Sequence, residues 1–97
     1  MPKGYWIAHV QVTDPERYKD YTAANAAPIR AYGGRFIVRG GSSQVRAGAL
    51  KERHVVVEFP DYAAAKACYD SAEYQAAAKI RDTAGKVDLV VIEGYEG

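Results

Sequence analysis

The residues with the clearest capacity for chemistry lie on a predicted helix late in the sequence. Tyr74, Ala77, Ala78 and Arg81 recur at three- and four-residue spacing, so they share one helical face. That face places a guanidinium group beside an otherwise apolar stripe. A planar guanidinium binds a carboxylate or an enolate through two parallel hydrogen bonds. The spacing therefore favours a site for a small anionic or carbonyl-bearing organic molecule, with Tyr74 and Arg81 as candidate catalytic residues.

Other tyrosines could line the same pocket, between a sheet and its helices. The candidates for ligand binding are Tyr18, Tyr21 and Tyr69. Chemistry without a cofactor would be proton transfer, in which Arg81 polarises the substrate and a tyrosine or histidine acts as acid or base. The alternative is structural. Arg81 then forms a salt bridge with Asp70 or Glu73, and the tyrosines fill core space around alanine-rich helices.

His9 is a second candidate for acid–base catalysis, because it lies in the middle of a predicted strand. Glu58 or Glu93 on the same sheet face could bring its titration near neutral pH. The alternative is a histidine whose hydrogen bonds serve an interface. His54 lies at the start of a strand and is a weaker candidate. Arg39 and Glu58 carry opposite charges on one face, and both are further candidates for ligand binding or for mutual pairing.

The sequence gives little support to metal, haem or nucleophile chemistry. Histidines and glutamates on different strands show no local spacing of metal ligands, and neither histidine falls on a predicted helix. We therefore predict no metal and no cofactor. Ser71 lacks the Gly-x-Ser-x-Gly turn of a serine nucleophile and suits a helix cap. Cys68 follows an alanine stripe, which is typical of a small buried residue.

Charge and composition exclude several classes of partner. The chain has 13 Lys and Arg against 12 Asp and Glu, so no excess charge attracts nucleic acid or an anionic membrane. RNA-recognition motifs share the order of elements predicted below, but Glu58 on the third strand replaces their stacking aromatics. A single cysteine permits no intrachain disulfide, and no long apolar stretch is present. We expect a cytoplasmic protein.

One domain spanning residues 1–97 must position the candidate residues, because a chain of this length builds one core. The predicted strands cover residues 5–12, 35–40, 53–59 and 86–95. Helices are expected after Asp14 and after Asp61, and the second helical region divides near Ser71. The resulting order, β-α-β-β-α-β, predicts a ferredoxin-like α+β fold with a four-stranded antiparallel sheet.

The first helix has one face rich in tyrosine. That face contains Tyr18, Thr22, Asn25, Ile29 and Tyr32, with Tyr21 beside them. Pro28 lacks the N–H that would bond the Ala24 carbonyl, so the helix should kink or break near Ala27 and resume briefly. Gly33 then provides a left-handed cap.

The stretch GGRFIVRGG, residues 33–41, contains two pairs of glycines. A phosphate-binding loop leads from a strand into a helix, whereas the first pair here follows a helix and leads into a strand. The stretch therefore predicts a strand. Gly40 and Gly41 permit a bulge or a close approach by another group, and the Ala-Gly-Ala segment at 47–49 predicts a hairpin turn.

Alternation along the strands divides the sheet into two faces. The face expected to pack on helices contains Trp6, Ala8, Val10, Val12, Phe36, Val38, Val55, Val57, Phe59, Val90 and Ile92. The opposite face contains Tyr5, Ile7, His9, Gln11, Ile37, Arg39, His54, Val56, Glu58, Leu89, Val91, Glu93 and Tyr95. The second set has too many aliphatic residues for a solvated surface. We expect a second copy to cover it, which makes the protein a homodimer.

Several stretches together resemble one known family. They are GYW, VTDPERY, GGRFIVRGG, VVVEFPDYAAAKACYDSAEYQ, the later Arg81 and IEGY. The combination is similar to the domain-of-unknown-function 1330 family, which often has tryptophan at the position of Tyr69. The resemblance implies a dimeric α/β barrel of ferredoxin-like halves, related in fold to antibiotic-biosynthesis monooxygenases, NIPSNAP proteins and EthD-like proteins. It implies no assigned reaction, so a non-catalytic dimeric module remains the alternative to a ligand-binding protein.

Overall fold

Residues 2–97 form four strands and three helices in the computed structural model. In chain order the elements are β1 (Gly4–Val12), α1 (Pro15–Ala31), β2 (Arg35–Arg39), β3 (Arg53–Phe59), α2 (Tyr62–Asp70), α3 (Ala72–Ala84) and β4 (Gly85–Glu93). The strands form one sheet in the order β2-β3-β1-β4, with all neighbours antiparallel. The predicted ferredoxin-like arrangement is confirmed, and its second helical region is divided into α2 and α3.

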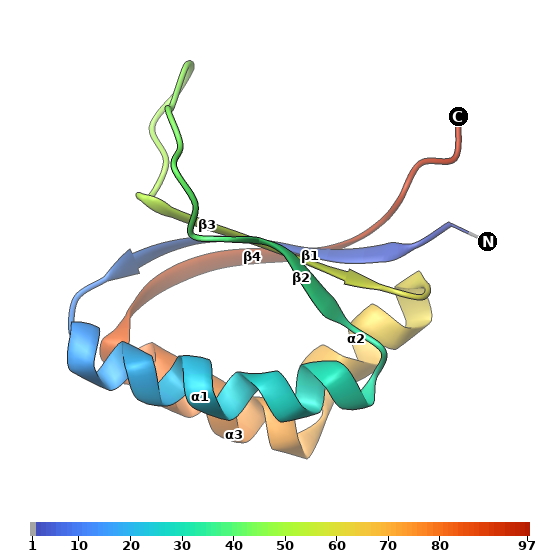
Figure 1. The fold of residues 1–97 in the computed structure, drawn as a ribbon, viewed down its shortest axis with the longest axis horizontal. Helices are drawn as coiled ribbons and strands as arrows, with labels where there is room; N and C mark the ends of the chain where they lie inside the picture. Colours follow the sequence, from blue (N-terminus) through green and yellow to red (C-terminus); the bar gives the residue numbers. More distant parts are fainter. Residues whose placement is uncertain (1) are drawn as a thin grey trace.

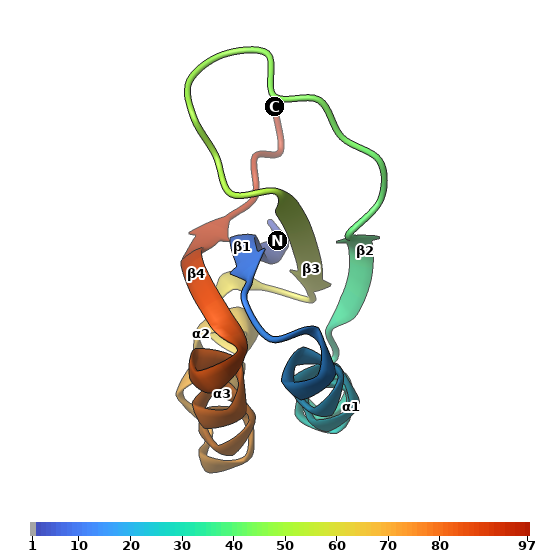
Figure 2. The same ribbon diagram turned by 90° about the vertical axis from the view of Figure 1, so that its left-hand side faces the viewer.

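The helices cover one face of the sheet and leave the other face open (Figure 1). Figure 2 shows the two layers from the end, with α1 and α3 side by side under the strands. Trp6 connects the layers, because its indole N–H donates to the Ala65 carbonyl at 2.8 Å. The centroid of its ring lies 5.1 Å from that of Phe59 and 4.7 Å from that of Tyr74. These contacts join β1, β3, α2 and α3 into one core.

Helix α1 begins and ends at the signals that the sequence contains. The Asp14 carboxylate accepts the backbone N–H of Arg17 at 3.1 Å and so caps the first turn. At the other end Gly33 has a φ of 80°, and the N–H of Gly34 donates to the Ile29 carbonyl at 2.9 Å. This pattern is a Schellman motif, which confirms the predicted left-handed cap.

Of the predicted kink or break near Ala27, the break is wrong, because Pro28 lies inside α1 and the helix continues to Ala31. Proline removes a single hydrogen bond here, the one to the Ala24 carbonyl. Pro28 and Ile29 are both buried, and the burial of their side chains offsets that loss. The inner face of α1 therefore stays continuous along the sheet.

Ser71 both ends α2 and starts α3. Its hydroxyl donates to the Cys68 carbonyl at 2.7 Å and accepts the backbone N–H of Tyr74 at 3.2 Å. The serine is therefore a helix cap, as the sequence predicts. Cys68 beside it is fully buried, and burial raises the pKa of its thiol to about 12. This cysteine is a small core residue rather than a reactive thiolate.

The predicted division of β4 between the two faces is wrong. Leu89 and Val91 lie opposite the buried residues of β1 and pack against the core. Val90 and Ile92 lie on the open face, where they are 49% and 45% exposed. Residues 89–92 are all aliphatic, so they show no alternation of polarity. Only the register with β1 decides which of them point inward.

A bulge in β2 reverses the predicted faces of two more residues. Phe36 pairs with Val57, but Val38 pairs with Val56, so the register shifts between them. Val38 therefore lies on the open face instead of the helix side. Arg39, which alternation places on the open face, instead points toward the helices and lines a pocket there.

Residues 40–52 connect β2 to β3 through a wide loop, which bends near Gly48, in the segment where the sequence predicts a hairpin turn. The loop stands away from the sheet on the open side, and the C-terminal residues extend to that side too (Figures 1 and 2). At its base Lys51 donates to the carboxylate of Asp88 in β4. The open face is therefore bordered by two projecting segments.

Candidate functional site

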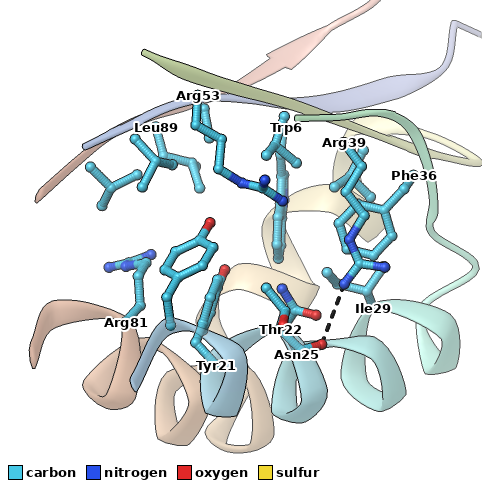
Figure 3. A pocket seen from close by; sticks show the side chains of 16 residues that line it. Trp6, Tyr21, Thr22, Asn25, Ile29, Phe36, Arg39, Arg53, Arg81 and Leu89 are labelled. Carbon is cyan, nitrogen blue, oxygen red and sulfur yellow. Dashed lines mark hydrogen bonds between the residues drawn. The ribbon is translucent and has the colours of Figure 1, made fainter. Parts of the chain in front are cut away.

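A pocket lies between the sheet and helices α1 and α3, where the spacing of the tyrosines and Arg81 predicts one (Figure 3). About 30 Å³ of it admits the centres of water molecules, and the whole depression, including its part open to solvent, measures about 460 Å³. The enclosed part has room for about two or three waters. A carboxylate group fits there, and the body of a larger ligand would extend into the open part.

The pocket combines apolar walls with guanidinium groups. Its arginines are Arg39, Arg53 and Arg81, which come from β2, β3 and α3. Among residues 2–97 no acidic side chain lines the pocket, and no group of three or more histidine, cysteine, aspartate or glutamate side chains gathers closely enough to hold a metal ion. Cations that share a partly desolvated space repel one another. The electrostatics of the pocket therefore favour an anion.

Arg53 projects from β3 into the pocket (Figure 3). Its Nε is buried and has no hydrogen-bond partner among the described residues. Its guanidinium lies 5.3 Å from the centroid of the Tyr18 ring. Burial raises the pKa of the Tyr18 hydroxyl, and the neighbouring Arg53 opposes part of that rise. A buried donor without an acceptor costs about 1–3 kcal/mol, so Arg53 is suited to receive one from a ligand.

Gly40 makes room for the guanidinium of Arg53. Its φ is 71°, and a Cβ at this position would lie 2.2 Å from Nη1 of Arg53. The positive φ therefore favours glycine, and a Cβ here would also force the Arg53 guanidinium to move. At Gly41 a Cβ would meet nothing within 4 Å. The close approach that the sequence predicts for this glycine pair involves Gly40 alone.

Arg39 lies at the exposed end of the pocket. Its Nη2 donates to the Thr22 carbonyl at 3.3 Å, and its guanidinium carbon lies 4.0 Å from the centroid of the Phe36 ring. Neither partner carries a charge, so the positive charge of Arg39 remains available to an anion arriving from solvent. Because the side chain is exposed, it can move aside for a ligand larger than the enclosed space.

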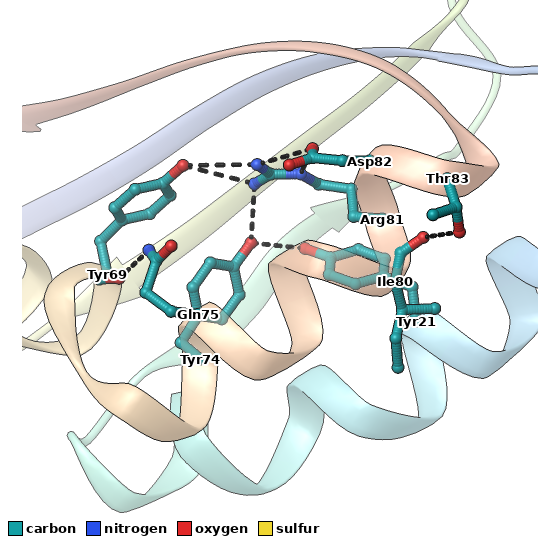
Figure 4. Close-up of polar contacts among 8 residues, drawn as sticks. All are labelled: Tyr21, Tyr69, Tyr74, Gln75, Ile80, Arg81, Asp82 and Thr83. Carbon is teal, nitrogen blue, oxygen red and sulfur yellow. Dashed lines mark hydrogen bonds and ion pairs between the residues drawn. The ribbon is translucent and has the colours of Figure 1, made fainter.

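Arg81 is the one pocket arginine whose nitrogens all have partners (Figure 4). It is 7% exposed and donates to the hydroxyls of Tyr69 and Tyr74 at 3.4 and 3.3 Å. It also forms a salt bridge with Asp82 at 3.1 Å. Tyr69 and Tyr74 therefore contact Arg81 but do not line the pocket. The acidic partner is Asp82, the next residue in the helix, instead of Asp70 or Glu73.

The hydrogen bonds around Arg81 determine its protonation and that of its neighbours. Burial alone would lower the pKa of Arg81, but its bond to Tyr69 and the nearby Tyr74 raise it above its ordinary value. Burial, together with the Tyr21 hydroxyl 2.6 Å away, raises the pKa of Tyr74 far above its usual range. Tyr74 is fully buried and does not line the pocket, so its hydroxyl positions Tyr21 and Arg81.

Asn25 faces the pocket from α1 and is 4% exposed. Its Oδ1 has no hydrogen-bond partner among the described residues. Figure 3 shows its side chain next to Thr22, below the sheet. The Thr22 hydroxyl already donates to the Lys19 carbonyl at 3.0 Å. Asn25 therefore places an unused acceptor in a pocket that is otherwise lined by cations, hydroxyls and apolar groups.

His9 and Glu58 lie on the open face of the sheet, on the opposite side from the pocket. The Nδ1 of His9 is 2.8 Å from the Nδ1 of His54, its partner in the strand register. The neighbour of His9 is thus a histidine instead of the expected Glu58 or Glu93. A hydrogen bond from Arg35 to Glu58 at 3.0 Å lowers the pKa of that carboxyl. The sheet separates these groups from the pocket arginines.

Sequence reasoning did not identify two of the pocket residues as site residues. Arg53 has the same parity in β3 as Val55 and Val57, and it points toward the helices with them. Asn25 belongs to the buried face of α1, and the sequence pattern gives it no role beyond its place on that face. In both cases the available signal was a polar group within a row of buried side chains.

The fold and the pocket define this protein as a member of the ferredoxin-like α+β class. A protein of unknown function from Rhodopseudomonas palustris matches with a TM-score of 0.78 at 16% identity, covering 99% of this chain and 85% of that one. A dimeric ferredoxin-like protein of unknown function from Thermobifida fusca matches with a TM-score of 0.63 at 17% identity, covering 95% of this chain and 91% of that one. SnoaB, a cofactor-independent oxygenase from Streptomyces nogalater, matches with a TM-score of 0.66 at 13% identity, covering 100% of this chain and 97% of that one. These similarities show a shared fold.

The chain belongs to the family described as domain of unknown function (DUF1330), whose family model matches residues 3–95. The resemblance inferred from the sequence stretches is confirmed. No curated protein matches the sequence. Within residues 2–97, none of the helices combines the length and the apolar character needed to cross a bilayer.

Proposed function

We propose that this protein binds a small organic acid in the pocket between the sheet and helices α1 and α3. The main support is Arg53, whose buried Nε lacks an acceptor in a pocket lined by no acidic side chain of residues 2–97. Arg39 adds a second guanidinium without a charged partner among the described residues. A carboxylate matches the planar fork of a guanidinium. The apolar walls suit the hydrocarbon part of such an acid.

The geometry favours binding over proton abstraction. A general base must be largely unprotonated near neutral pH, and the described pocket lining contains neither a carboxylate nor a histidine. The pKa of Tyr18 is raised, so its hydroxyl stays protonated. That hydroxyl could donate a proton to an enolate whose charge Arg53 stabilises. A reaction that begins with proton removal would need a base from the substrate or from solvent.

We further propose that two copies associate through their open faces. Val38, Val56, Ile7 and Val90 form a row across all four strands. Val38 and Val90 are 42% and 49% exposed, and covering such a row releases water from apolar surface. The neighbour from Thermobifida fusca is described as dimeric. If no acid binds in the pocket, this association describes the alternative function, a dimeric module without a ligand.

Thermal unfolding in the presence of acetate, propionate or butyrate tests the ligand proposal. Arg53→Met keeps the aliphatic stem and removes the charge. Arg17→Met is the matched control, because Arg17 is exposed on α1 and pairs with Asp20 away from the pocket. A ligand that binds only the native state raises the unfolding temperature in a saturable manner. We expect saturable stabilisation of the wild type and the control, and about tenfold weaker binding by Arg53→Met.

The uncharged amides of the same acids and sodium chloride at matched ionic strength complete the experiment. Neither should stabilise the protein, because a guanidinium site requires an anion of carboxylate geometry. The proposal would be wrong if no acid stabilises the wild type, or if acids stabilise the wild type, the control and Arg53→Met equally.

A further inference from the structure

We infer that the bound acid also carries a hydroxyl group, and that Asn25 selects for this hydroxyl. The inference rests on the proposed function, because it concerns the same pocket. The observation behind it is independent of the arginines, because it concerns a hydrogen-bond acceptor, whereas the arginines are donors. Asn25 is 4% exposed, lines the pocket and has an Oδ1 without a hydrogen-bond partner among the described residues.

A buried acceptor without a partner destabilises a protein, because the atom has lost its hydrogen bonds to water and gained none in return. A leucine in place of Asn25 would extend the buried inner face of α1 without leaving an acceptor unpaired. An amide facing the pocket therefore indicates that a donor arrives with the ligand. The described side chains around Asn25 supply no donor to its Oδ1, so a ligand that displaces water from the pocket must bring a donor of its own.

Three other polar side chains of the pocket are already engaged. The Thr22 hydroxyl donates to a backbone carbonyl, and the Tyr21 hydroxyl shares a 2.6 Å hydrogen bond with that of Tyr74. The nitrogens of Arg81 are all bonded. Within the described lining, the Oδ1 of Asn25 is thus the buried acceptor without a partner, and the Nε of Arg53 is the buried donor without one.

Arg53 and Asn25 approach the pocket from opposite sides. Arg53 extends from β3 in the sheet, whereas Asn25 extends from α1 below it (Figure 3). A ligand that uses both must carry its acid group at one end and its donor at the other. An ammonium donor is disfavoured, because three guanidinium groups line the space. A hydroxyl is neutral, so the structure favours a hydroxy acid over an amino acid.

Titration calorimetry with matched sets of acids tests this inference. The parent acids are acetate, propionate and butyrate, and the hydroxy acids are glycolate, 3-hydroxypropionate and 4-hydroxybutyrate, which vary the separation of the two groups. The corresponding methoxy acids keep the oxygen but cannot donate. We expect at least one hydroxy acid to bind about tenfold more tightly than its parent, because it satisfies a buried acceptor. The methoxy acid should lose that gain.

Two variants assign the preference to Asn25. Asn25→Leu removes the acceptor at similar volume, so the affinity for the hydroxy acid should fall by about tenfold relative to the affinity for the parent acid. Thr83→Val is the matched control, because the hydroxyl it removes is bonded to backbone and lies outside the pocket lining. It should keep the preference for the hydroxy acid. The methoxy comparison on the wild type needs no variant, so it decides the question even if Asn25→Leu does not fold.

Each outcome separates the inference from the proposed function. If parent, hydroxy and methoxy acids bind the wild type equally, the acid site stands and the role of Asn25 is wrong. If the hydroxy acid keeps its advantage in Asn25→Leu, another group accepts the hydroxyl and the inference is wrong. If none of the acids binds, the proposed function fails and the inference fails with it.

Discussion

Arg53 and Asn25 occupy positions at which the pattern of their elements places apolar side chains. Sequence reasoning could group the tyrosines with Arg81, because helical spacing fixes which side chains share a face. It could not identify the partners of Arg81, because a long side chain reaches several carboxylates and its rotamer selects Asp82. It also could not show that Arg53 lacks a partner, since a missing hydrogen bond depends on every group that surrounds the atom.

Tyr74→Phe tests the buried hydroxyl network at the scale of single residues. The change removes a partner from the Tyr21 hydroxyl and from Nη1 of Arg81, and it adds no steric conflict. We expect the free energy of unfolding to fall by about 1–3 kcal/mol, measured by urea denaturation. Tyr95→Phe is the control, because Tyr95 is 94% exposed. A loss no larger than that of the control would show that the network does not stabilise the fold.

The pKa of Cys68 leads to a prediction about alkaline pH. Burial raises it from 9.0 to about 12 in the folded state. Between these values the unfolded chain loses the thiol proton while the folded chain keeps it. The free energy of unfolding should therefore decrease as pH rises above about 9, with a slope of up to about 1.4 kcal/mol per pH unit from this group. The raised pKa values of Tyr18 and Tyr74 act in the same direction.

Urea denaturation of the wild type and of Cys68→Ala across this pH range, under reducing conditions, measures the contribution of the thiol. The variant should be somewhat less stable at neutral pH because it loses packing, but its stability should decline less steeply at alkaline pH. Identical slopes for the two proteins would contradict a thiol buried in the folded state.

At the scale of the elements, the boundaries were easier to predict than the faces. Helix and strand ends follow local signals such as the Asp14 cap and Gly33, which act within a few residues. The face of a strand depends on its neighbours. Residues 89–92 of β4 are uniformly aliphatic, and the β2 bulge reverses Val38 and Arg39. Register is set by pairing across the sheet, so a single strand does not encode it.

The two glycines after β2 provide a matched pair of variants. Gly40→Ala would place a methyl group against the Arg53 guanidinium at a positive φ, whereas Gly41→Ala meets open space. We expect Gly40→Ala to lose about 1–2 kcal/mol of stability from backbone strain and to bind acetate more weakly, because Arg53 is displaced. Gly41→Ala should change neither property. Calorimetry and urea denaturation measure both, and equal behaviour of the two variants would contradict the packing of Arg53 against Gly40.

At the scale of the whole molecule, the sheet separates two surfaces with different properties. The helix side holds the pocket, and the open side holds the aliphatic row together with the His9–His54 contact. The excess of aliphatic residues on the second face could be predicted from the sequence because it requires only alternation. The separation of the pocket arginines from His9 could not, since alternation places Arg39 on the same face as His9 and only the bulge in β2 turns it to the helix side.

Val90→Asp tests association through the open face. Val90 is 49% exposed and forms the β4 end of the aliphatic row, so burying a charge there should disfavour association of two copies. Sedimentation should show a wild-type dimer at micromolar concentration and a shift of the variant toward monomer, with an unchanged circular dichroism spectrum. Ala72→Asp, exposed on α3, is the control and should remain dimeric. A monomeric wild type, or a dimeric Val90→Asp, would show that this face does not form the interface.

The most direct test of the acid site is the Nε–H resonance of Arg53 in a ¹⁵N-resolved NMR spectrum, assigned with Arg53→Lys. This is the buried N–H that lacks an acceptor. If a carboxylate enters the pocket, titration with acetate should shift this resonance in a saturable manner, as a charge-assisted hydrogen bond forms. The Nε–H of Arg17, which donates to Thr83 at 3.1 Å on the exposed surface, should not shift in this way. An Arg53 resonance that stays unchanged, or that moves linearly with concentration like the exposed arginines, would contradict an anion site at this position.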